Sequence, residues 1–244
     1  MQAPATSETL HFAPARAFRQ SNGAATPAYN AGVDHPAMTT ERTVRHTVVA
    51  FESFLPEPAV ERLYAQSLAL ETAFVPSRTN DANPDIRRSL VLDAPPALVE
   101  PVVSRVRAVM PEVLATIRLP MVTVGRIEAQ VTANTDGSYF GIHTDADYGV
   151  QNLRHLTYVY YFNGHPLGFE GGILRVYDDL LRNNKLARGD TFQQVLPQHN
   201  TIVFFWARAM HEVEPVRVPS KAFRDSRFTV NGWVNRQPGP AAAA

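Results

Sequence analysis

The sequence predicts a mainly β domain with flanking helices, and three observations support this prediction. After Leu119, short runs of β-branched and aromatic residues alternate with turn residues. Apolar residues at helical spacing occur before that point, and no regular strand–helix alternation indicates a doubly wound parallel sheet. Many short strands of this kind are typical of a β-sandwich or a jelly roll. The 244 residues are enough for one domain with a large core.

The elements before Leu119 are predicted in chain order. Val44 to Phe51 has the pattern of a strand. Pro56 to Leu70 is predicted to form a helix with Pro56 in its first turn, where a missing amide hydrogen costs nothing. A second helix is expected from about Ala97 to Ile117, and Pro111 is expected to kink or divide it because proline breaks the helical hydrogen-bond ladder.

Eight strands are predicted after these helices. They span Met121–Thr132, Ser138–His143, His155–Asn163, Gly172–Tyr177, Thr191–Leu196, Asn200–Trp206, Val213–Val218 and Arg227–Val234. Residues 1–42, which are rich in alanine, are predicted to be loosely structured, residues 43–236 to form a single domain, and residues 237–244 to be a flexible tail.

Composition limits the functions that this chain can have. The 23 Lys and Arg residues balance the 23 Asp and Glu residues, so electrostatics gives no reason to expect nucleic acid or an anionic membrane as partner. With no cysteine, a metal site would use His, Asp, Glu or backbone oxygen, which favours iron, manganese or zinc over an iron–sulfur cluster. We find no signal peptide and no long apolar segment, and therefore expect a cytoplasmic protein.

The most informative pattern is His143-Thr144-Asp145, followed by His211. Residues i and i+2 of a strand project from the same face, so His143 and Asp145 are expected to point together while Thr144 points away. Two imidazoles and one carboxylate match the facial triad that holds non-haem Fe(II) and leaves positions open for other ligands. We therefore predict His143, Asp145 and His211 as metal ligands.

Arg227 comes 16 residues after His211, at the start of the last predicted strand. An iron site that uses 2-oxoglutarate needs a fixed cation for the far carboxylate of this dicarboxylate, and Arg227 fits in type and position. Thr229 and Asn231 share its strand face and are expected to add hydrogen bonds. A tyrosine from the strand that contains Tyr160 and Tyr161 is a further candidate, but these residues alone do not decide which of the two faces inward.

Substrate contacts are expected on the segments Ala146–Arg154, Arg78–Arg88, Leu180–Thr191 and Pro219–Asp225. Several of their arginines, Arg87 among them, are candidates for binding a substrate carboxylate through two hydrogen bonds. Trp206 and Trp233 are expected in the core.

From Ser138 to Val234 the chain resembles the prolyl 4-hydroxylase-like branch of the Fe(II)/2-oxoglutarate dioxygenases. The matching segments are His143-Thr144-Asp145, Tyr160 to Asn163, Glu170 to Arg175, Phe204 to Trp206, His211 to Val216, and Arg227 to Trp233. The resemblance implies a double-stranded β-helix (jelly roll) core supported by N-terminal helices. It also implies His143, Asp145 and His211 as iron ligands.

The same resemblance implies Arg227 as the 2-oxoglutarate anchor and places Tyr161, not Tyr160, against the same carboxylate. Asn231 stands where the family often has a threonine. About ten residues before the first ligand the family often has a tyrosine, and here that position is Ala133. The interval between His211 and the anchor is also long, and both departures indicate a substrate pocket unlike that of the oxygen-sensing hydroxylases.

The predicted function is therefore that of a dioxygenase that hydroxylates an unactivated C–H bond of an amino acid, a peptidyl (including prolyl) substrate or a small natural product. Fe(II), 2-oxoglutarate and O2 are the expected cofactor and co-substrates, with ascorbate as an optional cofactor, and succinate and CO2 are the expected products. Two alternatives are a metal-binding jelly roll without catalysis, acting as a sensor or interaction module, and a nucleic-acid demethylase with the same iron chemistry. No pattern in the sequence predicts the oligomeric state.

Overall fold

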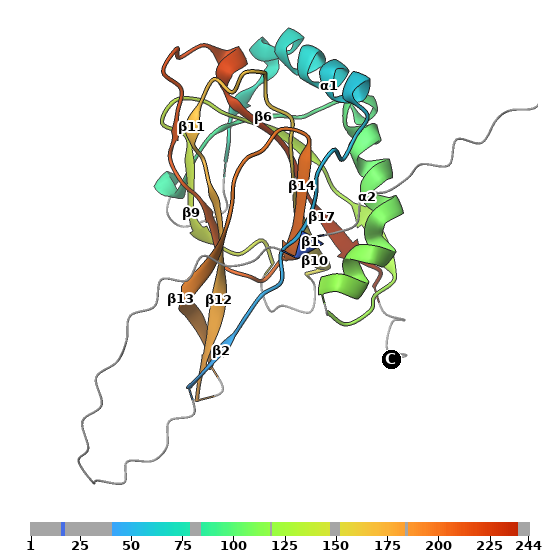
Figure 1. Ribbon diagram of the computed structural model, residues 1–244, viewed down its shortest axis with the longest axis vertical. Helices are drawn as coiled ribbons and strands as arrows, with labels where there is room; N and C mark the ends of the chain where they lie inside the picture. Colours follow the sequence, from blue (N-terminus) through green and yellow to red (C-terminus); the bar gives the residue numbers. More distant parts are fainter. Residues whose placement is uncertain are drawn as a thin grey trace, which may run out of the picture.

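Two antiparallel sheets face each other in the computed structural model, which describes residues 16–17, 41–78, 84–117, 119–146, 152–183 and 185–238 (Figure 1). We call them the large sheet and the small sheet. Their two facing surfaces enclose the interior of the domain, and two helices cover the outside of the large sheet. This arrangement confirms the predicted jelly roll supported by N-terminal helices.

The large sheet has nine strands in the order β1-β3-β14-β10-β17-β8-β6-β4, with β7 paired to β17. The bounds are Arg16–Ala17 (β1), Val49–Phe51 (β3), Val75–Pro76 (β4), Leu90–Leu92 (β6), Val124–Ile127 (β7), Gln130–Asn134 (β8), Arg154–Tyr161 (β10), Thr201–Trp206 (β14) and Arg227–Arg236 (β17).

The small sheet has six strands in the order β13-β12-β15-β9-β5, with β2 paired to β12. The bounds are Glu41–Val44 (β2), Arg87–Arg88 (β5), Tyr139–His143 (β9), Leu174–Arg182 (β12), Lys185–Val195 (β13) and His211–Val213 (β15). A separate pair consists of β11 (Glu170–Gly171) and β16 (Val216–Arg217). Short 3-10 turns span Glu71–Ala73, Pro84–Ile86 and Phe223–Asp225.

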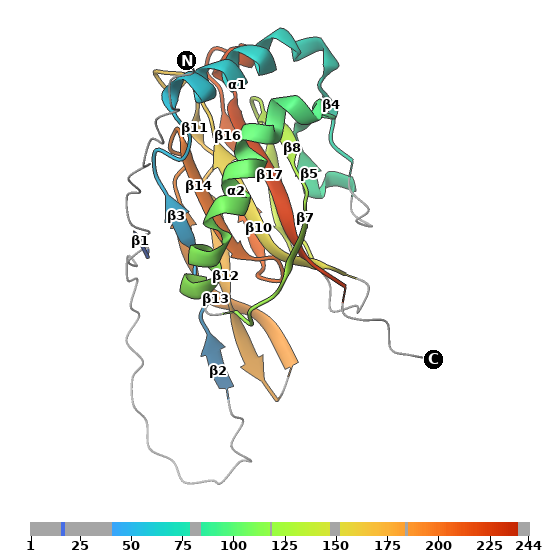
Figure 2. The same ribbon diagram turned by 90° about the vertical axis from the view of Figure 1, so that its right-hand side faces the viewer.

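The helices α1 (Glu57–Ala69) and α2 (Pro96–Ile117) lie over the outer face of the large sheet (Figure 2). Each presents an apolar stripe at helical spacing to one shared core. The buried members of these stripes include Val60, Leu63, Val102, Val106 and Val109. The helix α2 continues across Pro111, so of the predicted kink or division the division does not occur. No helix of the described ranges is long and apolar enough to cross a membrane.

Strand β10 shows how alternation divides the large sheet into two faces. Tyr158 and Tyr160 belong to the core beneath the helices, whereas Tyr161 packs between the sheets. The hydroxyl of Tyr160 donates to Asn200 Oδ1 at 3.0 Å, away from the interior. Because side chains of a strand alternate between faces, Thr157 and Val159 share the interior face with Tyr161. The parity that the family resemblance implied for Tyr161 is confirmed.

Three predicted strands are each divided in the structure. The segment Val44–Phe51 begins with the last residue of β2 in the small sheet and ends with β3 in the large sheet, so the chain changes sheets within it. Met121–Thr132 corresponds to β7 and β8, and Val213–Val218 contains the last residue of β15 and the whole of β16. Alternation of apolar residues does not reveal where a strand changes partner, because both halves remain extended.

The segment Leu180–Thr191, on which substrate contacts are expected, is not a loop but lies mostly in strands, and the expected contacts stay a prediction. It forms the far end of the β12–β13 hairpin, which projects from the body of the domain together with β2 (Figure 1). Arg182 in it is paired with Glu41 at 2.9 Å. The polar composition of this segment does not indicate strands, because an edge hairpin exposed on both faces needs no apolar alternation.

The predicted segments at the chain ends, 1–42 and 237–244, lie mostly outside the described residues. Strand β2 begins at Glu41, two residues before the predicted start of the domain. The division into segments therefore stays a prediction.

Candidate metal centre and its pocket

A cavity lies between the two sheets and encloses about 580 Å³, part of it open to solvent. Strands of both sheets line it, because the interior faces of β8, β10 and β17 lie opposite β9, β12 and β15. The lining residues are Arg87, Thr132, Asn134, Phe140, His143, Asp145, Thr157, Val159, Leu174, His211, Val213, Arg227, Thr229, Asn231, Gly232 and Trp233.

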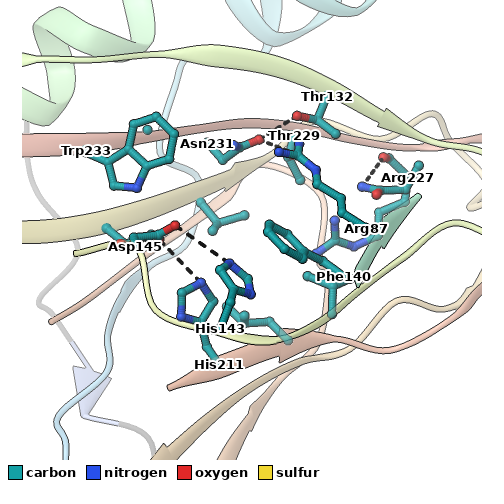
Figure 3. A pocket seen from close by; sticks show the side chains of 16 residues that line it. Arg87, Thr132, Phe140, His143, Asp145, His211, Arg227, Thr229, Asn231 and Trp233 are labelled. Atoms are coloured by element: carbon teal, nitrogen blue, oxygen red, sulfur yellow. Dashed lines mark hydrogen bonds and ion pairs between the residues drawn. The ribbon is translucent and has the colours of Figure 1, made fainter. Parts of the chain in front are cut away.

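The three predicted metal ligands meet at one end of this cavity (Figure 3). His143 ends β9 and His211 begins β15, and the two are direct partners in the antiparallel register. Their Nε2 atoms lie 3.7 and 3.3 Å from the two carboxylate oxygens of Asp145. One ligand atom from each residue falls within 4.8 Å of the others, which is the spacing needed to share one ion.

Asp145 does not lie on the strand, as the sequence predicted, but in a bend that follows β9. Its amide donates to the carbonyl of Ala207 at 3.0 Å, and this contact with the segment after β14 holds the bend. Thr144 is exposed, as predicted. The side chains of His143 and Asp145 therefore point together, but backbone contacts beyond the strand bring this about.

Both imidazoles are oriented by backbone carbonyls. The Nδ1 atom of His143 lies 2.8 Å from the carbonyl oxygen of Gly141, and that of His211 lies 3.0 Å from the carbonyl oxygen of Ala209. A carbonyl can only accept, so each Nδ1 carries a proton, and in the neutral imidazole each Nε2 presents a lone pair to the cavity. This arrangement is typical of histidine ligands in metal sites.

The carboxylate of Asp145 is held by Thr157 of β10, whose hydroxyl donates to Oδ2 at 2.6 Å. Burial raises the pKa of Asp145, but the charges of His211 and His143 and the hydrogen bonds from His211 and Thr157 outweigh it and bring the pKa below its ordinary value. The group is therefore a carboxylate at neutral pH. A carboxylate and neutral imidazoles are the protonation states that bind a metal ion.

The two histidines differ in their surroundings. Burial, with the charge of His211 in addition, lowers the pKa of His143 to about 3. Burial also opposes the charged form of His211, but the charge and hydrogen bond of Asp145 raise its pKa overall. A bound cation would take the place of the His211 proton beside the Asp145 carboxylate. Two imidazole nitrogens and a carboxylate that converge without sulfur therefore fit Fe(II), with an open side toward the cavity.

Arg227 is a buried cation in the same cavity. Its side chain comes from the start of β17 and the residue is 2% exposed. Nε and Nη2 are buried without a hydrogen-bond partner among the described residues, and Cζ lies 5.0 Å from the ring centre of Tyr161. The hydroxyl of Tyr161 is likewise buried without a partner there. A desolvated guanidinium without an anion is costly, so this end of the cavity fits an anionic ligand.

Burial lowers the pKa of Arg227, while the nearby Tyr161 acts in the opposite direction. An arginine stays charged under such shifts because its ordinary pKa is above 12. Burial also raises the pKa of Tyr161, so its phenol keeps the proton and can donate it in a hydrogen bond. The pair therefore offers one charged and one neutral donor to a carboxylate.

The chain makes room for Arg227 at Gly172. This glycine has φ of +64°, and a Cβ there would lie 2.6 Å from Cδ of Arg227. Its neighbour Gly171 has φ of +72°. Without a Cβ, these two glycines allow a tight turn, and Gly172 in addition leaves space for the buried guanidinium side chain.

Thr229 and Asn231 line the cavity beside Arg227, as their shared strand face predicted. The hydroxyls of Thr132 and Thr229 lie 2.8 and 3.3 Å from Oδ1 of Asn231. Accepting from both leaves the amide nitrogen of Asn231 as a donor toward the cavity. The position ten residues before His143, Ala133, instead lies in the core under the helices.

Sequence reasoning missed several residues of the cavity. Thr157 lies four residues before Tyr161 on the same strand, so the parity of that strand could have placed it there. Trp233 was expected in the core but lines the cavity, where the guanidinium of Arg154 stacks on its ring at 3.5 Å. Phe140 also lines the cavity and stacks on His143, with ring centres 3.4 Å apart.

The other predicted substrate segments have different outcomes. Residues 147–151 of Ala146–Arg154 and residues 79–83 of Arg78–Arg88 lie outside the described ranges. Pro219–Asp225 contributes no residue to the described lining of the cavity, whereas Arg87 does.

A jelly roll with a His, Asp, His cluster and a buried arginine in one cavity defines the class of facial-triad metalloproteins. Residues 129–235 match the family described as the 2OG-Fe(II) oxygenase superfamily. An uncharacterised PKHD-type hydroxylase of Synechocystis is 37% identical over 188 residues, which are 76% of this chain and 62% of that protein. The chain therefore spans less than two thirds of the length of this curated relative.

Solved structures share the fold. A prolyl 4-hydroxylase of Pseudomonas putida has a TM-score of 0.59 at 20% identity and covers 79% of this chain and 94% of its own. A prolyl hydroxylase of Trichoplax adhaerens, solved with a peptide of hypoxia inducible factor, has a TM-score of 0.58 at 17% identity, covering 78% and 83%. Residues 129–235 of the chain are thus similar to the 2OG-Fe(II) oxygenase superfamily, and the chain has a prolyl 4-hydroxylase-like fold.

Proposed function

We propose that this protein is an Fe(II)- and 2-oxoglutarate-dependent dioxygenase that hydroxylates an unactivated C–H bond. In the overall reaction, the substrate C–H, O2 and 2-oxoglutarate give C–OH, succinate and CO2. The match of residues 129–235 to the 2OG-Fe(II) oxygenase superfamily supports the reaction type. The single observation that carries the assignment to this chain is the presence, in one cavity, of three converging metal-ligand side chains and a buried arginine without an anionic partner among the described residues.

In this proposal His143, Asp145 and His211 hold the iron, which supplies oxygen activation coupled to decarboxylation of the 2-oxo acid. The backbone carbonyls behind the imidazoles keep each Nε2 directed at the iron, and Thr157 keeps the carboxylate in place. Such fixed orientation lowers the cost of assembling the site when its ligands arrive.

Arg227 binds the far carboxylate of 2-oxoglutarate in the proposal, with the Tyr161 phenol as a second donor. Thr229 and Asn231 extend the polar wall along the same strand face. Binding at both ends orients 2-oxoglutarate in the proposal, because its far carboxylate binds Arg227 while its oxo-acid end reaches the metal triad. Apolar side chains such as Val159, Leu174 and Val213 line the cavity and limit water there.

The substrate is an amino acid, a peptide or a small natural product in this proposal. A prolyl peptide is one candidate substrate, because the solved prolyl hydroxylases share the fold. At 20% identity or less, this likeness supports the fold alone. Ascorbate as an optional cofactor and a cytoplasmic location stay predictions from the sequence.

The experiment is to supply the anaerobically purified protein with Fe(II), 2-oxoglutarate and a panel of prolyl peptides and free amino acids, admit oxygen, and measure succinate. We expect succinate from the wild type and none above background from His143→Ala or Arg227→Gln. Arg217→Gln is the matched control, because Arg217 is exposed and paired with Glu170 at 3.0 Å. Iron binding without any 2-oxoglutarate binding would contradict the proposal and favour a metal-binding jelly roll without catalysis.

A further inference from the structure

A second guanidinium, that of Arg87, lines the same cavity as Arg227 (Figure 3). It belongs to β5 at the edge of the small sheet, where Arg87 is the register partner of Phe140. Arg227 belongs to the large sheet. The cavity therefore has two cations on different sheets, and the proposed binding of 2-oxoglutarate uses one of them.

Among the described residues, the contacts of Arg87 are with neutral groups. Its Nε donates to Ser89 Oγ at 3.0 Å, and its Nη2 lies 3.4 Å from Gln130 Oε1. Its Cζ lies 4.9 Å from the ring centre of Phe140, which stacks in turn on His143. Within the described ranges no Asp or Glu oxygen lies within 4.0 Å of the guanidinium, and Nη1 makes no hydrogen bond there.

The charge of Arg87 is only weakly compensated. Burial lowers its pKa, and the one charge that acts in the opposite direction is that of Asp145. In the proposed function Asp145 is a ligand of the iron, so its negative charge is shared with a dication. A partly buried guanidinium held between Ser89, Gln130 and a phenyl ring is thus prepared for an anion that the described residues do not supply.

We propose that Arg87 binds the carboxylate of the substrate, so that the substrate is a small carboxylic acid such as a free or N-acylated amino acid. This inference rests on the proposed function and decides between its candidates, since an internal residue of a peptide has no α-carboxylate. Phe140 holds the guanidinium plane next to His143 and thereby sets the carboxylate beside the triad. The oxidised C–H bond then belongs to the carbon chain that extends from this carboxylate toward the iron.

The test uses the protein loaded with Mn(II) and saturated with 2-oxoglutarate, in which no turnover occurs. The probes are N-acetyl amino acids, each as the free acid and as the primary amide, and binding is measured by calorimetry. We expect at least one acid to bind, and to bind at least tenfold more tightly than its amide, because a charge-assisted hydrogen bond is lost in the amide. In Arg87→Gln this preference is expected to disappear, whereas Arg87→Lys keeps part of it.

Arg88→Gln is the matched control, because Arg88 is the next residue of β5 and is exposed. It is expected to keep the preference for acids. The affinity for 2-oxoglutarate is measured separately, and we expect Arg87→Gln to keep it within twofold of the wild type. If the wild type fails to bind 2-oxoglutarate, the proposed function has failed, and this outcome is distinct from a failure at Arg87.

Four results would overturn the role of Arg87 while leaving the proposed function intact. These are amides that bind as tightly as acids, an unchanged preference in Arg87→Gln, a loss of 2-oxoglutarate affinity in Arg87→Gln, and a wild type that binds 2-oxoglutarate but none of the acids. The comparison of acids with amides needs only the wild type, so the test holds even if a variant fails to fold.

Discussion

The hydroxyl of Thr157 holds the carboxylate of Asp145, and its removal tests whether the triad is a metal site. Thr157 is 4% exposed, and its hydroxyl donates to Asp145 Oδ2 at 2.6 Å. Thr157→Val replaces the hydroxyl by a methyl group of similar size. The fold should persist, because valine is favourable in a strand. The carboxylate should lose the neighbour that fixes its orientation.

The magnitude follows from the type of bond. A short hydrogen bond to a charged group contributes about 1.5–3 kcal/mol. If that stabilisation is lost from the metal-bound state, the dissociation constant of Fe(II) rises about tenfold to about a hundredfold. Substitutions of groups that orient metal ligands have effects of the same order.

The assay is a competition titration of Fe(II) under anaerobic conditions against a chromophoric chelator. Thr191→Val is the matched control, because the Thr191 hydroxyl donates to Asp178 Oδ2 at the same 2.6 Å, away from the residues that line the cavity. We expect weaker metal binding in Thr157→Val only. An affinity within twofold of the wild type, or an equal loss in Thr191→Val, would refute the reasoning.

Three further substitutions test the site and the fold. Tyr161→Phe removes a buried hydroxyl that has no partner among the described residues, so it should weaken 2-oxoglutarate binding about tenfold with little change in the unfolding midpoint; a large loss of stability would contradict a ligand-binding role. Gly172→Ala should weaken 2-oxoglutarate binding, because the added Cβ displaces Arg227. Gly171 also has positive φ, so Gly171→Ala should cost stability but keep the affinity for 2-oxoglutarate. Equal 2-oxoglutarate affinities of the two variants in calorimetry would exclude the displacement. Asn200→Ala removes four side-chain hydrogen bonds at a position with φ of +56° and should lower the free energy of unfolding in urea by about 3 kcal/mol; a change below about 1 kcal/mol would show that these bonds are not needed.

The triad and the arginine could be predicted because they depend on strand geometry and residue type. His143 and His211 lie on neighbouring strands, and Arg227, Thr229 and Asn231 share a face, as period-two alternation requires. The choice between the two tyrosines required the family resemblance, because both residues are equally apolar and both are buried.

What could not be predicted depends on contacts between distant segments. Asp145 leaves the strand because its amide bonds the carbonyl of Ala207, and no local signal shows this. Arg87 was one of several arginines in predicted loops, and only the pairing of β5 with β9 brings it into the cavity. The sequence predicts strands at Gly172–Tyr177 and Thr191–Leu196 but not the far end of the β12–β13 hairpin, because polar residues cover that exposed end.

The central claim is that one cavity binds Fe(II) through the triad and 2-oxoglutarate through Arg227. The most direct measurement is an anaerobic titration of 2-oxoglutarate into the Fe(II)-loaded protein, followed by the visible charge-transfer absorption of the complex, with bound iron counted in parallel. Arg227→Gln should retain iron and bind 2-oxoglutarate at least about 30-fold more weakly, since loss of one partner of a buried charge pair costs about 2–5 kcal/mol. His211→Ala should lose the iron. An Arg227→Gln protein that binds 2-oxoglutarate as tightly as the wild type would contradict the account.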